Sequence, residues 1–524
     1  MKRGLLALAL LVGGAAGAGE PGRGFELAEI TIDDVQRRME SGTFTAERLT
    51  AAYLARIEAI DRSGPSLRAV IEVNPDALAI AREMDRERGS GKIRGPLHGV
   101  PVLIKDNIAT ADGMETTAGS ILLIGARPRS DAVLVERLRA AGAVILGKTN
   151  LSEWANFRST RSVSGWSSRG GQTLNPYALD RSPSGSSSGS AVAVAANLCV
   201  VAVGTETDGS IVSPASANGI VGVKPTVGAV SRTGVIPISV SQDTAGPMAR
   251  TVRDAALLLE VLVGRDQRDA ATDEQPEGFG AEFAAELERP ALRGARLGVL
   301  RGPFGLHPKT DGVLDQALER LREAEAEIVE LSEFAALEKA GEAEMEALLY
   351  EFKDGLNVYL ASLSGATKAK DLAGAIAFNA AHADETMPFF GQDVFDRAQQ
   401  KGFLSEKAYL DARATCIRIV KTEGIDRWMA EHQLDAIVTI TAGPAWMIDP
   451  VNGDVYTGGS STLAAVAGYP SVTVPAGEVN GLPVGVLFTG AAWSDKKILQ
   501  LAADFERRAP ARKAPEFPAT LPVP

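Results

Sequence analysis

The sequence predicts a layered α/β fold, because short apolar runs typical of buried strands alternate with helical segments along the chain. Hydrophobic residues make up 45% of the 524 positions, which is enough for a large buried core. The chain also contains 54 glycines, which suits a fold rich in tight turns and in close approaches between backbone segments.

Two helices are expected first, over residues 31–61. Thr31 and Asp34 have the spacing of a capping box, and Gly42 ends the first helix. The second helix has one apolar face at helical spacing, formed by Leu49, Tyr53, Ile57 and Ile60.

Strands and helices then alternate through the middle of the chain. We expect a strand at 100–104 that ends at Lys105, a helix at 131–141 and a strand at 143–146. An Ala-rich helix at 191–198 and a buried strand at 199–203 follow. This order of elements is what predicts the layering.

The second half of the chain is less regular. Residues 264–292 are polar and are expected to form a surface excursion, and residues 310–430 are expected to be mostly helical. The charged run 338–346 is interpreted as a solvated helix face. Buried strands with their turns are expected at 464–475 and 482–490, and an extended Pro-rich tail from Arg507.

The first 18 residues have the three parts of a secretory signal peptide. Lys2 and Arg3 give a positive start, residues 5–12 are apolar, and Ala16-Gly17-Ala18 forms a small-residue cleavage site. A retained membrane anchor is disfavoured, because the apolar stretch is far shorter than the roughly 20 residues that a spanning helix needs. We therefore expect cleavage after Ala18 and a secreted or periplasmic location without stable membrane association.

Charge and composition argue against several partners and cofactors. The formal net charge of −12 disfavours nucleic acid and anionic membranes, because binding phosphates needs clustered Lys and Arg. The only two cysteines, Cys199 and Cys416, have no metal-ligand spacing, and the four histidines are scattered, so no metal site is expected. Cys199 lies in an apolar run and is interpreted as a buried small hydrophobe. Whether the two cysteines are paired stays open.

Two local motifs match known patterns but lack the required surroundings. Residues 142–149 match the phosphate-binding pattern G-x-x-x-x-G-K-T, but the intervening residues form an apolar run that is expected to be a strand. Residues 185–189 match the G-x-S-x-G nucleophile elbow with Ser187 as the nucleophile. The residues before them are polar and contain a proline where that elbow requires a strand, so both motifs are rejected.

Three other segments stand out together. Residues 95–108 place Lys105 at the end of an apolar strand, and residues 182–190 form a loop rich in serine and glycine. Residues 204–214 form a turn that leaves a buried strand and contains Ser210. Taken singly, each segment has an ordinary structural explanation: a surface lysine, a flexible turn and a helix cap.

Together the three segments resemble the amidase signature family, and the likeness covers nearly the whole chain after residue 18. It extends, in the family's order, to residues 147–150 (GKTN), 222–226 (GVKPT), 243–248 (DTAGPM) and 482–485 (LPVG). The resemblance implies a central mixed β-sheet covered by helices on both faces. It also implies one domain over residues 19–524, with a variable helical region at 310–430, that hydrolyses linear amides without a cofactor.

The resemblance also assigns catalytic roles. The base falls on Lys105, the proton relay on Ser186 behind a cis Gly185–Ser186 bond, and the nucleophile on Ser210. The oxyanion hole is expected in the backbone N–H groups of the turn, namely those of Thr207, Asp208, Gly209 and Ser210. Trp154 and Asn156 fall in the segment that lines the substrate side in the family, with ordinary packing and a turn as the alternative.

These roles make chemical sense. A serine hydroxyl is a weak nucleophile and needs an adjacent base. A lysine can be that base only when neutral, and an unperturbed lysine is neutral in roughly one molecule in two thousand at pH 7. Burial of Lys105 behind an apolar strand is expected to lower its pKa.

The chain departs from the common family pattern in the turn. Many members have Asp-Thr-Gly-Gly-Ser-Ile-Arg where residues 206–212 read ETDGSIV, so Asp208 replaces a glycine and Val212 an arginine. Ser184 and Ser188 also replace glycines. These departures resemble the bacterial peptide amidase branch, whose members remove the C-terminal carboxamide of peptides to give the free acid and ammonia.

Several alternatives stay in view. A role within an amidotransferase that acts on charged tRNA is disfavoured by the signal peptide and the acidic balance. An acylamidase for small, aryl or fatty amides remains, as does a non-catalytic extracytoplasmic binding protein on the same fold. The presence of Lys105, Ser186 and Ser210 favours an enzyme over a binding protein. The natural substrate, the side-chain preference, the oligomeric state and the role of residues 310–430 stay open.

Overall fold

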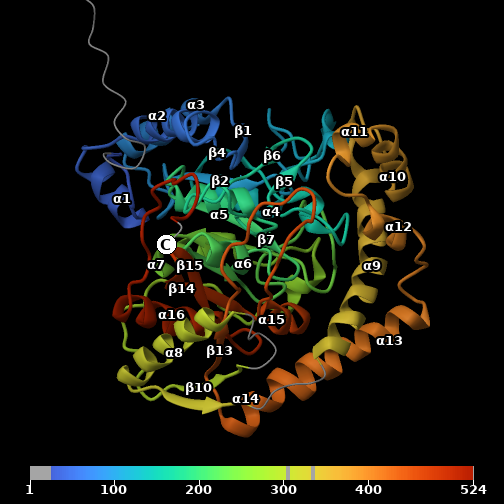
Figure 1. Ribbon diagram of the computed structural model, residues 1–524. Coiled ribbons are helices and arrows are strands. Elements are labelled where there is room, and N and C mark those ends of the chain that lie inside the picture. Colours follow the sequence, from blue (N-terminus) through green and yellow to red (C-terminus); the bar gives the residue numbers. More distant parts are fainter. Residues whose placement is uncertain (1–24, 302–306, 332–336, 523–524) are drawn as a thin grey trace, which may run out of the picture.

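One mixed sheet of 11 strands forms the centre of the molecule, in the order β1-β4-β2-β7-β9-β8-β14-β15-β13-β10-β11 (Figure 1). In that order the strands are β1 (Val70–Val73), β4 (Val144–Thr149), β2 (Pro101–Lys105), β7 (Val201–Glu206), β9 (Thr244–Ala249), β8 (Val221–Lys224), β14 (Ser471–Val479), β15 (Leu482–Thr489), β13 (Ala436–Ile440), β10 (Arg296–Val299) and β11 (Glu327–Glu330). β4, β2 and β7 are parallel, as are β13, β10 and β11, and the other pairs are antiparallel. The predicted α/β class with a mixed sheet is confirmed.

The computed structural model describes residues 25–301, 307–331 and 337–522. The predicted signal peptide, residues 1–18, lies outside these ranges and stays a prediction. Within them, no helix is both long and apolar enough to cross a membrane. Cys199 and Cys416 are both buried and free.

Helices flank the sheet. α5 (Ser188–Ala195) packs against β2, β4 and β7, and α6 (Val212–Ala217) packs against β8, β14 and β15. The other helices that surround the sheet are α1 (Ile32–Glu40), α2 (Ala46–Arg56), α3 (Ala77–Gly89), α4 (Val133–Ala140), α7 (Val252–Leu262), α8 (Pro308–Glu323), α15 (Ser461–Ala467) and α16 (Asp495–Arg508). The central strands are buried along their whole length, as strands covered by helices are expected to be.

The N-terminal helices follow the sequence signals closely. Thr31 and Asp34 form the predicted capping box at the start of α1, which ends just before Gly42. α2 continues into a π-helical turn, Ile57–Arg62, so the second predicted helix is one rod with a change of hydrogen-bond pattern near its end.

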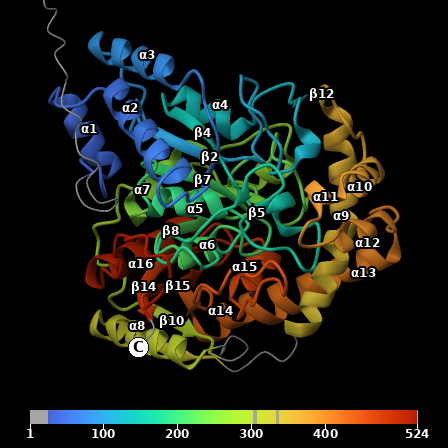
Figure 2. The same ribbon diagram turned by 45° about the horizontal axis from the view of Figure 1, so that its top comes forward.

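A second helical layer lies along one side of the molecule, opposite α1 to α3 (Figures 1 and 2). It consists of α9 (Leu337–Ser362), α10 (Leu372–Ala381), α11 (Ala383–Thr386), α12 (Asp393–Gln399) and α13 (Lys407–Cys416), followed by the π-helical segment Ile417–Asp426 and α14 (Arg427–His432). A separate apolar core joins this layer to the rest, with Leu348 and Phe352 of α9 packed in one cluster with Phe157 and Ile238. The described residues between 310 and 430 are thus mostly helical, as predicted, with edge strand β11 and the short strand Ser364–Gly365 among the exceptions.

Three local predictions were wrong in part. Residues 464–467 belong to α15 instead of a strand, because the Ala-rich run favours a helix that Gly468 ends at φ +73. The surface excursion at 264–292 is anchored by Phe283 and Leu287, which are buried in the main core. The charged run 338–346 is not wholly solvated, because Glu344 is only 6% exposed.

Candidate active site

Lys105 lies at the carboxyl end of β2 and is fully buried. Its Nζ lies 2.8 Å from Ser186 Oγ, 2.9 Å from Thr205 Oγ1 and 3.2 Å from the Thr205 carbonyl oxygen. A neutral amine has two N–H donors and one lone pair. If the two donors face the two oxygens of Thr205, the lone pair faces the Ser186 hydroxyl and can accept its proton.

Two other lysines, Lys148 and Lys224, are equally buried, but neither contacts a serine hydroxyl. Lys148 donates to the Ile108 carbonyl oxygen at 2.6 Å, and Lys224 donates to that of Tyr469 at 2.7 Å. A carbonyl oxygen has no proton to give, so these two contacts hold backbone segments together. Lys105 is therefore the buried lysine of the described chain that is placed for proton transfer through a serine.

The serine-rich loop holds Ser186 close to the turn that carries Ser210. The Gly185–Ser186 peptide bond is cis, as the resemblance implied. The backbone N–H of Ser187 donates to the Ser210 carbonyl oxygen at 3.1 Å, which joins the loop to the turn. The Ser187 hydroxyl donates to the Thr205 carbonyl oxygen at 3.0 Å and is buried, so it braces β7 and is not presented as an elbow nucleophile.

The turn after β7 presents free backbone donors. None of the N–H groups of residues 207–210 donates a hydrogen bond within the described part of the chain. Gly209 has φ +75, a backbone conformation that favours glycine, and a side chain there would come within 2.8 Å of Ser461 Oγ. Free amides beside a nucleophile are what an oxyanion hole requires.

Two buried carboxylates hold this turn in place. Glu206 Oε2 accepts hydrogen bonds from the backbone N–H groups of Ile211 at 2.6 Å and Val212 at 3.0 Å. Asp243 Oδ1 accepts one from the Thr207 hydroxyl at 2.6 Å. Neither Glu206 nor Asp243 was predicted as a site residue; the one available signal was a carboxylate at the end of a buried strand, Glu206 closing β7 and Asp243 directly preceding β9.

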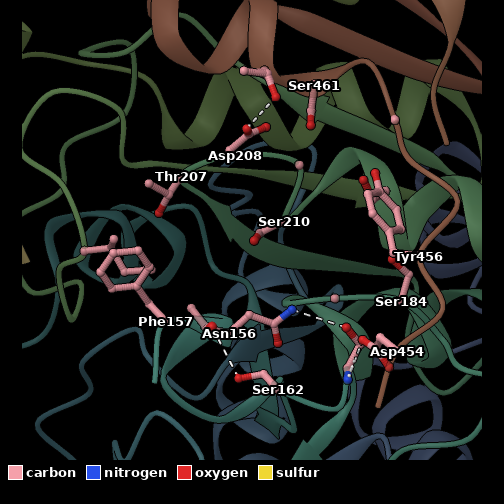
Figure 3. A pocket seen from close by; sticks show the side chains of 18 of the residues that line it. Asn156, Phe157, Ser162, Ser184, Thr207, Asp208, Ser210, Asp454, Tyr456 and Ser461 are labelled. Carbon is pink, nitrogen blue, oxygen red and sulfur yellow. Dashed lines mark hydrogen bonds between the residues drawn. The ribbon is translucent and has the colours of Figure 1, made fainter. Parts of the chain in front are cut away.

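An open cavity of about 480 Å³ lies over the turn (Figure 3). Ser210 is 9% exposed and points into it, and its hydroxyl has no hydrogen-bond partner within the described residues. A much smaller cavity beneath is lined by both Ser186 and Ser210. The main cavity is walled mainly by four segments distant in sequence, residues 155–164, 207–213, 341–348 and 446–462, with Ser184, Gly185 and Ile238 completing the wall.

The two predicted substrate contacts lie in different places. Asn156 lines the cavity and donates to Ser164 Oγ at 3.2 Å, while its Oδ1 is buried without a partner. Trp154 is 2% exposed and packs edge-to-face against Phe395 at 5.7 Å, outside the main cavity. Trp154 therefore has the packing role that was its alternative explanation, and Phe157, Trp446 and Tyr456 are the aromatic residues that line the cavity.

The electrostatics suit a lysine that is neutral near physiological pH. Burial lowers the pKa of Lys105 to about 7, although the Glu206 and Asp243 carboxylates oppose the shift. Burial also raises the pKa of Asp243 to about 6, against its hydrogen bond from Thr207. At pH 7 a large share of molecules therefore has Lys105 in the form that accepts a proton.

We expect kcat/KM for an amide substrate to rise with pH through a midpoint near 7, because the pKa of Lys105 in the free enzyme is about 7 and only the neutral amine is active. Activity at pH 6 should be about tenfold below the plateau. The Asp243→Asn variant should move this midpoint to lower pH, since it removes a negative charge that raises the pKa of Lys105. A midpoint that stays in place or moves to higher pH would contradict the assignment.

The fold and this pocket define a class of protein, the serine hydrolases that cleave amides with lysine in place of histidine. The model of the Amidase family matches residues 48–499, and the chain therefore belongs to the amidase signature family. It is an amide-hydrolysing enzyme of that family.

Known proteins agree with this placement. The crystal structure of peptide amidase from Stenotrophomonas maltophilia has a TM-score of 0.90 at 53% identity and covers 94% of this chain and 100% of that one. The crystal structure of an amidase family protein from Bacillus anthracis has a TM-score of 0.84 at 35% identity and covers 94% and 93%, respectively. A protein of Arabidopsis thaliana described as a "Probable amidase" is 42% identical over 94% of this chain and 92% of its own length.

Proposed function

We propose that this enzyme removes the C-terminal carboxamide of peptides, giving the free acid and ammonia through an acyl-enzyme on Ser210. The observation that carries the proposal is the 2.8 Å contact between Lys105 Nζ and Ser186 Oγ, directly beneath the cavity that Ser210 lines. Peptide substrates are further supported by the 53% identity to the peptide amidase of Stenotrophomonas maltophilia.

The lining of the cavity also supports a peptide over a fatty amide. Besides Ser210, ten hydroxyl-bearing residues line it, namely Ser159, Thr160, Ser162, Ser164, Ser184, Thr207, Ser213, Tyr456, Ser461 and Thr462. Such groups can pair with the N–H and C=O groups of a peptide. Apolar side chains, including Phe157, Met345 and Leu348, also line the cavity and can accommodate a peptide side chain.

In the first half of the reaction, Ser210 Oγ attacks the carboxamide carbon. Its proton passes to Ser186, and the proton of Ser186 passes to Lys105. The free N–H groups of the turn stabilise the negative charge on the carbonyl oxygen. Lys105 then returns a proton through Ser186 to the leaving nitrogen, the C–N bond breaks, and ammonia leaves.

In the second half, water attacks the acyl group on Ser210. Lys105 again takes a proton through Ser186, and the proton returns to Ser210 Oγ as the ester bond breaks. The peptide leaves with a free carboxylate. Both halves use the same neutral amine. The pH–rate profile should therefore fall on its acidic side with a single midpoint.

Ammonia release from a panel of amides tests the substrate class. We expect turnover of short peptide amides at kcat/KM at least tenfold above that of fatty and aryl amides of similar size, because the cavity offers hydroxyl groups to peptide bonds. The same peptides with a free C-terminal acid serve as the blank. Equal or faster turnover of the aryl or fatty amides would favour the acylamidase alternative.

A further inference from the structure

The main cavity is acidic. Three carboxylates line it, Asp208, Glu344 and Asp454, and among the described residues no lysine, arginine or histidine lines it. They come from three separate segments: the turn after β7, helix α9, and the loop between β13 and α15. Because a carboxamide loses only ammonia, the rest of a peptide amide must occupy this cavity on the acyl side of the scissile bond.

The three carboxylates differ in how well the protein satisfies them. Asp454 accepts hydrogen bonds on both oxygens, from the Trp446 Nε1–H and from the Ser164 backbone N–H, each at 2.9 Å. Both of its oxygens are therefore satisfied by the cavity wall itself. Asp454 orients Trp446 and needs no ligand.

Glu344 and Asp208 are left short of donors. Glu344 Oε1 accepts from Gln242 Nε2 at 2.7 Å, but Oε2 receives no hydrogen bond from any described residue, although the side chain is only 6% exposed. Asp208 Oδ2 accepts from the Thr462 hydroxyl at 2.7 Å, while Oδ1 is buried without a partner. Asp208 Oδ1 is closed off from solvent, so its missing donor costs free energy, whereas Glu344 Oε2 borders the cavity and can receive a donor from a ligand.

The charges around Glu344 and Asp208 do not make up for the missing hydrogen-bond donors. Burial and the neighbouring Asp208 raise the pKa of Glu344 well above its usual range, and burial also raises the pKa of Asp208, against its hydrogen bond from the Thr462 hydroxyl. Two cations outside the cavity lining, Arg413 and Lys224, oppose these pKa shifts without cancelling them. Arg413 of α13 lies 3.7 Å from Glu351, and Lys224 donates to backbone carbonyl oxygens.

We propose that Glu344 and Asp208 form a subsite for a cationic group on the acyl portion of the substrate, an ammonium or a guanidinium. This inference rests on the proposed peptide amide function and specifies it. The cation donates to Glu344 Oε2, and its positive charge offsets the repulsion between Glu344 and Asp208. Asp208 is two residues before Ser210, so the subsite lies next to the reacting carbonyl.

Matched substrate pairs test the subsite in the unmodified enzyme. N-acetyl-lysinamide is compared with N-acetyl-norleucinamide, which has a similar chain without the charge. Glycyl-norleucinamide is compared with its N-acetylated form, which lacks the α-ammonium. We expect kcat/KM to be about ten- to hundredfold higher for the cationic member of at least one pair, the range for a hydrogen bond to a charged group. The pair that responds identifies the side chain or the N-terminus as the source of the cation.

The Glu344→Gln variant keeps the shape of the side chain and removes its charge. We expect the ratio of kcat/KM between the cationic and neutral members to fall about tenfold. Glu342→Gln is the matched control, since Glu342 lies on the same helix but is not buried, and there the ratio should equal that of the unmodified enzyme. Equal kcat/KM within both pairs of the unmodified enzyme, or a ratio that Glu344→Gln leaves intact, would overturn the subsite.

Binding to the Ser210→Ala protein separates this inference from the proposed function. Calorimetry should give a Kd about tenfold lower for the cationic member of the responding pair, without any turnover. Equal affinities would overturn the subsite whether or not peptide amides are hydrolysed. A clear difference in affinity, combined with no ammonia release by the unmodified enzyme, would overturn the proposed function and leave the subsite standing.

Discussion

Replacing Lys105 with arginine should give a folded protein with almost no turnover. Arginine keeps the positive charge but cannot lose its proton near neutral pH, so it cannot accept the proton of Ser186. Loss of an essential general base costs roughly 10²- to 10⁴-fold in rate. Lys105→Ala should be about equally inactive, and both are measured as kcat for ammonia release from a peptide amide, with circular dichroism as the check on folding.

Lys148 provides a matched control for this result. Burial lowers the pKa of Lys148 to about 8, and it is as buried as Lys105, but its partners are a carbonyl oxygen and the hydroxyl of Thr116. Lys148→Met should lower the melting temperature while leaving the midpoint of the pH profile in place. A Lys105→Arg enzyme with near-normal kcat would show that Lys105 acts only as a charge, and Ser210 would then lack an identified activator.

Replacing Ser210 with alanine should abolish both turnover and covalent labelling by a fluorophosphonate probe, while the protein still folds. The side chain faces an open cavity and has no hydrogen-bond partner within the described residues, so its removal costs little stability. The unmodified enzyme should be labelled at Ser210, as shown by peptide mass spectrometry. A folded, unmodified protein that the probe does not label would instead support a non-catalytic binding protein.

Ser187→Ala separates this assignment from the elbow motif. The Ser187 hydroxyl donates to the Thr205 carbonyl oxygen and accepts from the Thr205 backbone N–H, so its loss should cost roughly 1 kcal/mol of stability or more. Labelling and measurable turnover should persist. If Ser187→Ala abolishes labelling and Ser210→Ala does not, the nucleophile has been assigned to the wrong serine.

Five of the eleven strands of the central sheet, β2, β4, β7, β14 and β15, were predicted because they carry their own signal, whereas β1, β8, β9, β10, β11 and β13 were not. The runs around residues 100–105 and 143–149 are apolar and buried on both sides, so hydrophobicity alone locates them. The helix boundaries at Thr31 and Gly42 were also set by local capping chemistry. Residues 464–467 were misassigned because a short apolar run cannot distinguish a buried strand from a buried helix.

The catalytic positions were located through family resemblance, whereas the recognition residues depend on tertiary contacts. Glu344 lies in a run of charges that is typical of a solvated helix, and nothing local distinguishes it from Glu342. Only the packing of α9 over the turn brings one of these glutamates to the cavity. Trp154 is the opposite case: it was expected at the cavity but packs against Phe395. The sequence could not predict this contact, because Phe395 lies far along the chain.

The walls of the cavity belong to two different parts of the fold, and this has a consequence for redesign. The reacting groups belong to the sheet and its adjoining loops, whereas α9 belongs to a helical layer with its own apolar core. Its residues Gly341, Glu344, Met345 and Leu348 recur at helical spacing and face the cavity. Substitutions at these four positions can therefore retune which amides are accepted while leaving the proton path from Ser186 to Lys105 intact. A library confined to α9 would explore substrate range without disturbing the chemistry.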